Sequence, residues 1–307
     1  MTAAVDFIAY ILTVSVPYIL AGEGMTLAGR SGMFLVSNEG VMLASASATF
    51  LVAFFTGNVY FGLVAGALLG ALFGVLMGFF TITLKQDQFI VGLGLFILGT
   101  GVATMLYKVF IGVTLTPPIS ATLKGIQALE VIPIIGPVLA KENVMFYFAV
   151  LLTVFIWFFL YRTRYGLKVR SVGESPRTAD SLGTNVTLVR YAMTIVGTAI
   201  IALGGAYIPL VFTGTYTDTL ISGRGWISIL LALFGRWDPR LVLVGAIVFA
   251  GVEVSALYAQ VLGVPVPNQV LRMIPFMVAL VIMVEVYRHA EVPKGLGKNY
   301  DRESLED

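Results

Sequence analysis

The chain has 307 residues, of which 58% are hydrophobic and only 12% charged, and its formal net charge is +2. A mean hydropathy of +0.93 lies far above the range of soluble domains, so the composition predicts a membrane protein with several spans. The small net charge gives no reason to expect a nucleic-acid partner, and the absence of cysteine excludes disulfides, thiolate metal sites and cysteine nucleophiles.

The N-terminal part carries two apolar runs, residues 5–21 and residues 35–55, each long enough to cross a bilayer as a helix. A stretch rich in small residues separates them, with glycines at positions 22, 24, 29, 32 and 40. Non-helical backbone survives at membrane depth only where protein or a water-filled cavity satisfies its hydrogen bonds. We therefore expect a helix that is broken or re-entrant around residues 22–32 and lines a transport path. Three candidate residues for that path lie beside it: Asn38, Glu39 and Gly40.

The third apolar run covers residues 60–84, and glycine recurs in it at every fourth position: Gly62, Gly66, Gly70, Gly74 and Gly78. This spacing leaves one helix face almost free of side chains, which lets a second helix approach closely inside a bilayer. The glycine ladder predicts tight packing within the subunit, with a face between two subunits as the alternative.

A fourth run covers residues 89–110, and residues 111–143 then form a long loop with four prolines and only two cations. Its low positive charge places this loop outside the cell. The apolar piece from 129 to 139 is too short and too rich in proline to cross the bilayer, so we expect it to cap the outer mouth. A fifth span, residues 145–161, follows.

The loop from residue 162 to residue 190 holds six cations between two spans, which predicts a cytoplasmic position. Within it, Ser175 suits the N-cap of a helix, Pro176 suits the first helical position and Gly183 suits a stop. We expect a short, exposed helix over residues 176–182.

Beyond the loop, residues 191–212 form a sixth span, and residues 225–234 are apolar but reach only about 15 Å as a helix, half of a hydrocarbon core. That segment is therefore expected to be tilted, extended by flanking residues, or a half-helix. Two further spans cover residues 241–262 and 270–287.

Counting outward from the cytoplasmic loop gives about nine membrane segments, with about eight to ten as the range, an external N-terminus and an internal C-terminus. The predicted fold is an all-α polytopic transmembrane bundle with broken or re-entrant helices, in a single domain over residues 1–288. A polar cytoplasmic tail, residues 289–307, is expected to be solvated.

The chemistry open to such a chain is narrow, because no GxxxxGK[ST], HExxH or GxSxG motif is present. Glu253 falls near the middle of the span 241–262, where a charge is costly and marks a functional site by default. A hydrogen-bonded structural glutamate facing the bundle is an equally weighted interpretation. No metal site is predicted.

Three blocks carry a resemblance to a known family, and they read YGLKVRSVGESPRTADSLGTNVTLVRY, GRSGMFLVSNEGVML and GRGWISILLALFGRWDP. The first resembles the pattern GLRxRAVGENPxAADxxGIxVxxxR of permeases of ABC importers in the branched-chain amino acid, ribose and nucleoside group. The other two resemble that family's RSGVxNIGLEGMML and GRGFIALAxxIFGRWxP. The similarity is closest to the shorter of the two permeases in nucleoside or simple-sugar importers.

The resemblance implies that part of the cytoplasmic loop is a coupling helix that binds a groove of an ATPase subunit. The residues carried over by position are Gly173, Glu174, Ser175, Pro176, Ala179, Asp180 and Gly183. Ala179 and Asp180 are expected to face the ATPase. Glu39 and Gly40 match the family's Glu-Gly, whereas Leu35 stands where the family usually has Asn, and Asn38 replaces an apolar residue.

The implied function is that of a non-enzymatic permease subunit of an ABC importer in the inner membrane of a prokaryotic cell. The implied partners are an ABC ATPase, a second permease in a heterodimer or homodimer, and an extracellular or periplasmic substrate-binding protein. This chain is expected to bind no cofactor, since ATP and Mg are used by the ATPase. A nucleoside or purine is the expected substrate, followed by a simple sugar. A proton-coupled secondary transporter with Glu253 as its proton site is the alternative, and a channel is third.

Overall fold

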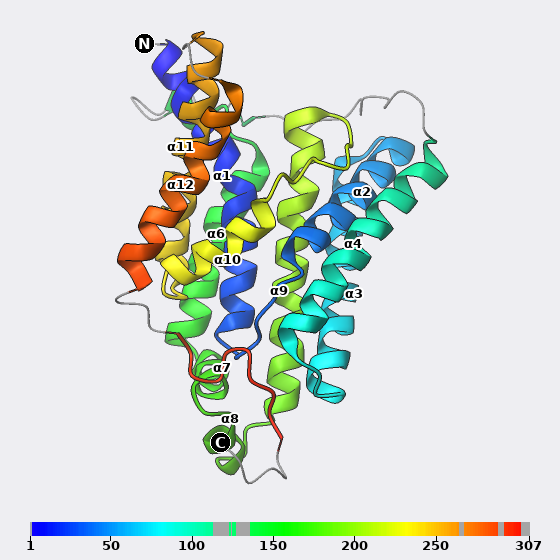
Figure 1. Cartoon of the computed structure of the whole chain (residues 1–307), viewed down its shortest axis with the longest axis vertical. Helices are drawn as coiled ribbons and strands as arrows, with labels where there is room; N and C mark the ends of the chain where they lie inside the picture. The colour runs from blue at the N-terminus through cyan, green and yellow to red at the C-terminus, as the bar shows by residue number, and fades with distance from the viewer. Residues whose placement is uncertain are drawn as a thin grey trace.

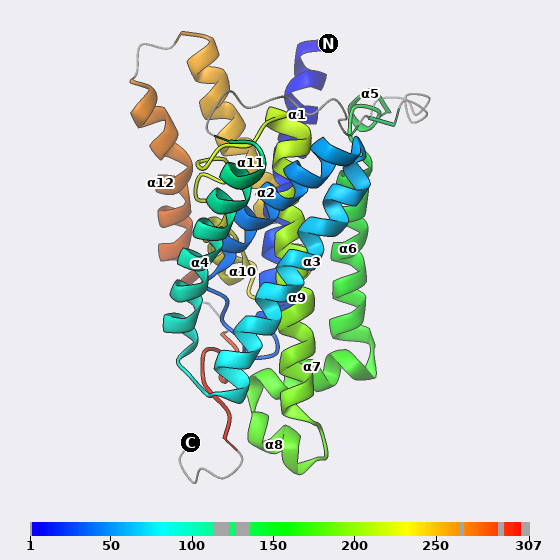
Figure 2. The same ribbon diagram turned by 90° about the vertical axis from the view of Figure 1, so that its right-hand side faces the viewer.

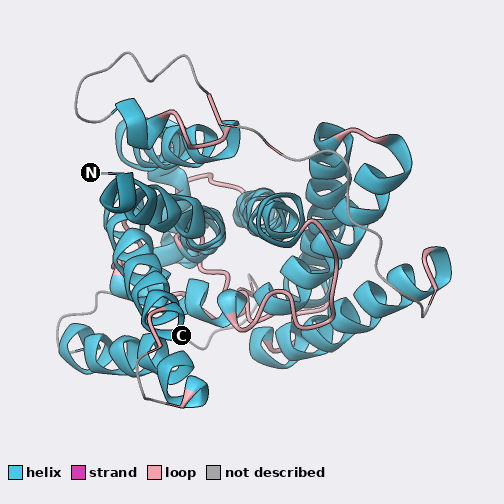
Figure 3. Cartoon of the chain, turned by 90° about the horizontal axis from the view of Figure 1, so that it is seen from above, coloured by secondary structure: helices cyan, strands magenta, loops and turns pink. Residues whose placement is uncertain are grey.

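The computed structural model describes residues 2–112, 123, 125–126, 136–263, 267–287 and 292–301. Over this part of the chain the fold is helical, with helices joined by loops and turns and no strand (Figure 3). Seven helices are long and apolar enough to cross a membrane: α1 (Thr2–Gly29), α2 (Asn38–Thr56), α3 (Val59–Gly78) with a π turn, α4 (Gln88–Phe110), α6 (Val144–Arg162), α9 (Val186–Ile208) with a π turn, and α11 (Pro239–Val261).

Two shorter apolar helices, α10 (Arg224–Phe234) and α12 (Asn268–Tyr287), bring the membrane segments of the described chain to the predicted nine. α10 is the expected half-helix. The short α5 (Gly136–Leu139) belongs to the predicted external loop, and most of that loop's apolar piece lies outside the described residues.

The helices are arranged around α1 and α9, which lie side by side in the centre (Figures 1 and 2). α2, α3 and α4 pack on one side of this pair, and α6, α11 and α12 lie on the other, with α10 between the two groups. The N-terminus lies at one end of the long axis, and the C-terminus lies at the other, beside α7 (Arg164–Glu174) and α8 (Pro176–Ser181). The two ends of the chain are thus on opposite sides, as the count of crossings predicts.

The expected break around residues 22–32 is misplaced, because α1 continues unbroken through Gly22 and Gly24 and ends only at Gly29. These glycines serve packing: a Cβ on Gly22 would lie 2.6 Å from Val242 Cγ1, and one on Gly24 would lie 2.8 Å from Ile201 Cγ1. Past the end of α1 the chain makes a turn, and it changes direction at Gly32, whose φ is +90°.

From there a non-helical stretch, residues 33–37, runs back from the lower end of α1 to the start of α2 midway along the molecule (Figure 1). Protein surrounds it on all sides, because every residue of the stretch except the half-buried Phe34 is buried. The broken segment therefore exists, but it follows α1 and precedes α2.

The glycine ladder of α3 packs inside the chain, against α2 and α9. A Cβ on Gly62 would lie 2.7 Å from the carbonyl oxygen of Thr49, and one on Gly70 would lie 2.8 Å from that of Thr198. α3 and α9 consequently approach backbone to backbone, as small residues permit in lipid. The side chains on the outer face of α3 are large, apolar and exposed, as a lipid-facing surface requires.

The cytoplasmic loop contains more structure than predicted. Thr163 caps α7 by accepting a hydrogen bond from the backbone of Gly166, and Ser175 caps α8 by accepting one from Thr178. α8 begins at Pro176 and ends at Ser181, and the chain turns at Gly183 with a φ of +82°. The helix α7 was missed because its glycines, Gly166 and Gly173, have low helix propensity. Both glycines are needed, because the backbone of α6 lies against Gly166 and the backbone of the α1–α2 link lies against Gly173.

Candidate functional site

The first candidate site is the end of the bundle from which α7 and α8 project, the end that the cation count predicts to be cytoplasmic (Figure 2). Gly173 joins this projection to the link between α1 and α2: a Cβ there would lie 3.3 Å from the backbone nitrogen of Gly32 and closer still to the carbonyl oxygen of Arg30. α7 is therefore in direct contact with the link that leads into α2, so a movement of α7 and α8 would displace that link.

Ala179 does not face outward, contrary to expectation. It is only 2% exposed and packs with Val172 and Val186 in a small hydrophobic cluster against which Tyr300 lies. Asp180 points the same way and accepts a hydrogen bond from the Tyr300 hydroxyl at 3.0 Å. The periodicity of α8 alone could not assign its faces, because the residues it packs on come from α7, α9 and the C-terminal tail.

The outward face of α8 is formed by other residues. Leu182 is 80% exposed at the C-terminal end of the helix, and Glu174, Thr178 and Ser181 are exposed beside it. These exposed side chains are the part of α8 and its flanks that lies open to a partner.

The C-terminal tail was expected to be solvated, but over the residues described it is only partly exposed and lies against the helices. Residues 292–301, here called the C-terminal strap, run across the end of the bundle from which α7 and α8 project (Figure 1). The backbone nitrogen of Gly295 donates to the carbonyl of Gly173 at 2.8 Å, and that of Gly297 donates to the carbonyl of Gly32 at 3.1 Å. The strap therefore bonds to both sides of the contact between α7 and the α1–α2 link.

Two other elements, α9 and the turn before α4, hold the far end of the strap. Arg190, buried at the start of α9, donates to the carbonyl of Lys298 at 2.9 Å. Asn299 donates to the carbonyl of Lys85 at 2.6 Å, in the turn before α4. The pair between Lys85 and Asp301, at 2.8 Å, is about half exposed and adds little by itself. Hydropathy could not predict that the strap binds here. The strap is held by hydrogen bonds between polar groups, and a polar segment held in this way has the same hydropathy as a solvated one.

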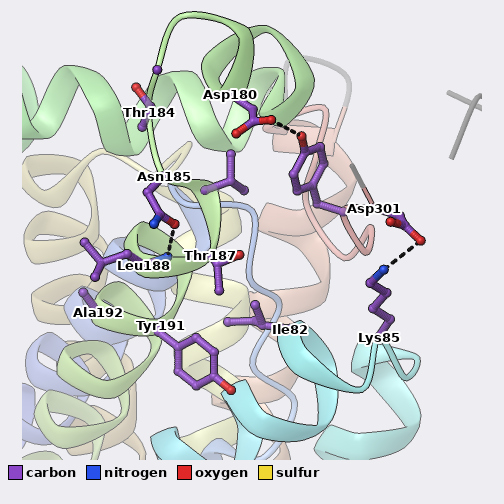
Figure 4. Close-up of a pocket in the computed structure, with 13 residues that line it drawn as sticks. Ile82, Lys85, Asp180, Thr184, Asn185, Thr187, Leu188, Tyr191, Ala192 and Asp301 are labelled. Carbon is purple, nitrogen blue, oxygen red and sulfur yellow. Dashed lines mark hydrogen bonds and ion pairs between the residues drawn. The ribbon is translucent and has the colours of Figure 1, made fainter. Parts of the chain in front are cut away.

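A cleft of about 1060 Å³ opens beside the strap (Figure 4). The α8–α9 turn forms one wall, and the end of α3 with Lys85 and Asp301 forms the other. Tyr191 lies between them and shares a hydrogen bond of 2.6 Å with Thr83. The cleft thus separates the projection formed by α7 and α8 from the α3–α4 turn.

The second candidate site lies at membrane depth, where α10 begins. Both oxygens of Glu39 accept backbone hydrogen bonds there, from Gly223 at 2.8 Å and from Gly225 at 2.7 Å. Asn38 donates to Ser228 one turn further on, at 2.9 Å. A carboxylate at a helix N-terminus is favoured by the free amides and by the helix dipole. Glu39 and Asn38 therefore hold the half-helix against the start of α2.

Gly40 lies on the opposite side of α2, where a Cβ would come 2.7 Å from the Cα of Phe96 in α4. Its role is close contact between helices. The structure brings Asn38 and Glu39 together at α10 and places Gly40 away from them.

Glu253 is paired. Arg224, the first residue of α10, donates to Glu253 Oε1 at 2.6 Å, and the hydroxyl of Tyr18 donates to Oε2 at 2.7 Å. The guanidinium of Arg224 also lies 5.8 Å from the centre of the Tyr18 ring, within cation–π range. Sequence reasoning missed the pairing, since the partners are 29 and 235 residues from Glu253.

Comparisons with known proteins agree with this architecture. The family described as "Branched-chain amino acid transport system / permease component" matches residues 7–283. A protein of Haloferax volcanii named "Putative glucose ABC transporter permease protein TsgC13" is 30% identical over 93% of this chain and 94% of its own length. The nucleoside ABC transporter permease protein NupC of Lactococcus lactis is 27% identical over 95% of this chain and 96% of its own.

The guanosine ABC transporter permease protein NupQ of Bacillus subtilis is 28% identical, covering 94% of both chains. A solved structure described as "An inward-facing conformation of a putative metal-chelate type ABC transporter" is similar in fold, with a TM-score of 0.52 over 92% of this chain and 86% of that one. At 18% identity this likeness shows the fold alone. With a family match over residues 7–283 and nine apolar helices among the described residues, the chain belongs to the permease family of branched-chain amino acid transport systems.

Proposed function

We propose that this multi-pass permease is the membrane-spanning subunit of an ABC importer in the inner membrane of a prokaryotic cell. The observation that carries the proposal is the projection of α7 and α8, which exposes Leu182 outward while Gly173 contacts the α1–α2 link. A projection that both offers a contact surface and touches the transmembrane helices can convey movement between a partner and the bundle.

The partners proposed are an ABC ATPase that binds and hydrolyses ATP with Mg, a second permease and an extracellular substrate-binding protein. A heterodimer of permeases is favoured over a homodimer, because the sequence resembles the shorter of two paired permeases. The outward face of α8 would bind the ATPase through Leu182 and its exposed neighbours.

The proposed substrate is a neutral polar solute, with a nucleoside first and a simple sugar second. Two similar permeases are named for a nucleoside and guanosine, and a third for glucose. At the start of α10, Arg224 pairs with Glu253, and the backbone amides of the helix N-terminus bind the carboxylate of Glu39. A charged substrate would leave an unbalanced charge at membrane depth, which is costly.

The Arg224–Glu253 pair favours the ABC importer over a proton-coupled transporter. Glu253 is already held in an ion pair with Arg224 at 2.6 Å, which is the structural interpretation of this glutamate.

The test is uptake into proteoliposomes that contain the complete transporter with its ATPase and binding protein. Labelled guanosine, glucose and leucine are supplied with ATP inside the vesicles, and vesicles without ATP are the control. We expect ATP-dependent accumulation of guanosine that persists when an ionophore collapses the proton gradient. Accumulation driven by a proton gradient without ATP would contradict the importer, and ATP-driven uptake of leucine alone would contradict the substrate class.

A further inference from the structure

A cavity of about 410 Å³ lies between α1, α10, α11 and α12, beside the Arg224–Glu253 pair. These four helices contact one another on one side of the bundle (Figures 1 and 2). The volume is within the range of about 300 to 1,000 Å³ typical of small-molecule sites. Tyr18, Arg224 and Glu253 line it together, so the polar groups already described face the space.

Two of the donors at this cavity have no partner. Arg224 Nε and Gln260 Nε2 are buried and make no hydrogen bond within the part of the chain that the structure describes. Leaving a buried donor unsatisfied costs about 1 to 3 kcal/mol, so such donors normally bond to a ligand or to water. Each oxygen of Glu253 accepts one bond and retains a further lone pair. The site can therefore bind a molecule that carries both acceptors and hydroxyl donors.

The remaining walls are aromatic. Phe249 packs edge-to-face with Tyr18, with ring centroids 5.2 Å apart. Phe276 lies across the cavity's edge against α10, where its ring would be 3.6 Å from a Cβ on Gly223. This side chain lines the cavity and is 46% exposed, so the described residues leave part of its ring uncovered.

We propose that this cavity binds a nucleoside within the permease, with the ribose hydroxyls at Arg224, Glu253 and Gln260 and the base against Phe276. Adjacent hydroxyls can donate to the carboxylate and accept from the guanidinium and the amide, which satisfies the two free donors without adding charge. A nucleoside also supplies the flat ring that a simple sugar lacks. This site rests on the proposed function, because it assigns that function's substrate to particular side chains.

The experiment measures binding directly, in the absence of the extracellular binding protein. The permease complex with its ATPase is placed in nanodiscs and titrated with tritiated guanosine, with unlabelled glucose as competitor. Gln260→Leu removes a free donor at similar size, and Phe276→Ala removes the stacking face. Tyr258→Phe, which removes a hydroxyl from the same helix outside the cavity, is the matched control.

We expect each cavity variant to weaken guanosine binding about tenfold, and Tyr258→Phe to leave it unchanged. Equal affinity in the wild type and both cavity variants would overturn the site, as would wild-type complexes that transport guanosine but bind none of it in nanodiscs. Binding of glucose in preference to guanosine would overturn the nucleoside assignment. Failure of the proposed function gives a different result, namely no ATP-driven uptake by the wild type in proteoliposomes.

Discussion

The side chains of Arg224 and Glu253 are 14% and 20% exposed, so water screens their charges weakly. Removing one partner of such a pair leaves a buried charge without compensation. We expect Glu253→Gln to lower the free energy of unfolding by about 2 to 4 kcal/mol, measured as a fall in the melting temperature of the detergent-solubilised permease. The double variant Arg224→Gln, Glu253→Gln should recover part of the loss, and the exposed Glu174→Gln should show none. An unchanged melting temperature in Glu253→Gln would mean that the pair is not stabilising.

Glu142 lies just before α6 at the external end, where it is buried and accepts a hydrogen bond from Thr13 of α1. Burial raises the pKa of Glu142 from 4.5 to about 7, because the charged form loses its hydration, and the bond from Thr13 only partly opposes this. Between these values the unfolded chain has lost the proton and the folded chain keeps it. Stability therefore falls as pH rises through this window and is lowest above it.

We expect the melting temperature of the wild-type permease to fall between pH 5 and pH 8 by the equivalent of about 1 to 3 kcal/mol. Glu142→Gln cannot ionise and should remove most of this fall. A fall of equal size in the variant would assign the pH dependence to other groups.

The glycine ladder lets α3 lie backbone to backbone against α9. Gly70→Leu places a four-carbon side chain where only hydrogen fits, and overpacking of this kind costs about 1 to 3 kcal/mol or prevents assembly. We expect loss of folded protein in size-exclusion chromatography, without a change in substrate preference of what remains. Gly94→Leu is the matched control, because a Cβ there meets no atom within 4 Å. Normal assembly of Gly70→Leu with altered substrate preference would contradict the packing role.

The assignment of faces on α8 separates two substitutions that the sequence does not distinguish. Leu182→Arg changes an exposed side chain, so we expect a folded permease whose affinity for the ATPase falls about tenfold. Ala179→Arg forces a charge into the cluster with Val172 and Val186, so it should destabilise the projection itself. Pull-down of the ATPase and melting temperature together distinguish the two effects. Full ATPase binding by Leu182→Arg would show that this face is not the contact.

The C-terminal strap connects three elements at one end of the molecule. It forms hydrogen bonds with α7, with the α1–α2 link and with the turn before α4. Deleting residues 292–307 should loosen the coupling projection relative to the transmembrane helices. We expect the amount of solute imported per ATP hydrolysed to fall about two- to tenfold, with the ATPase still bound.

Tyr300→Phe offers a milder test of the strap, because it removes only the hydrogen bond to Asp180 and should reduce coupling less than the deletion. The exposed Lys294→Ala, on the strap itself, is the control. If the amount of solute imported per ATP hydrolysed is unchanged after the deletion, the strap has no part in coupling.

Features that depend only on neighbouring residues could be predicted before the fold was known. Hydropathy over about twenty residues decides which segments cross a bilayer, and the excess of cations in the loop 162–190 predicts its side. Ser175, Pro176 and Gly183 define α8 because capping and turn conformations are local. The fourfold glycine spacing likewise indicated a close helix contact without naming its partner.

Contacts between segments that are distant in the sequence could be assigned only from the folded arrangement. It turned Ala179 inward, paired Glu253 with Arg224 and fixed the tail to Gly173, and it carried α1 past Gly22 and Gly24 because neighbouring helices fill the space beside them. None of these outcomes follows from propensity or hydropathy. Which face of a helix is buried, and which polar groups meet, depends on the surfaces that other parts of the chain bring to it.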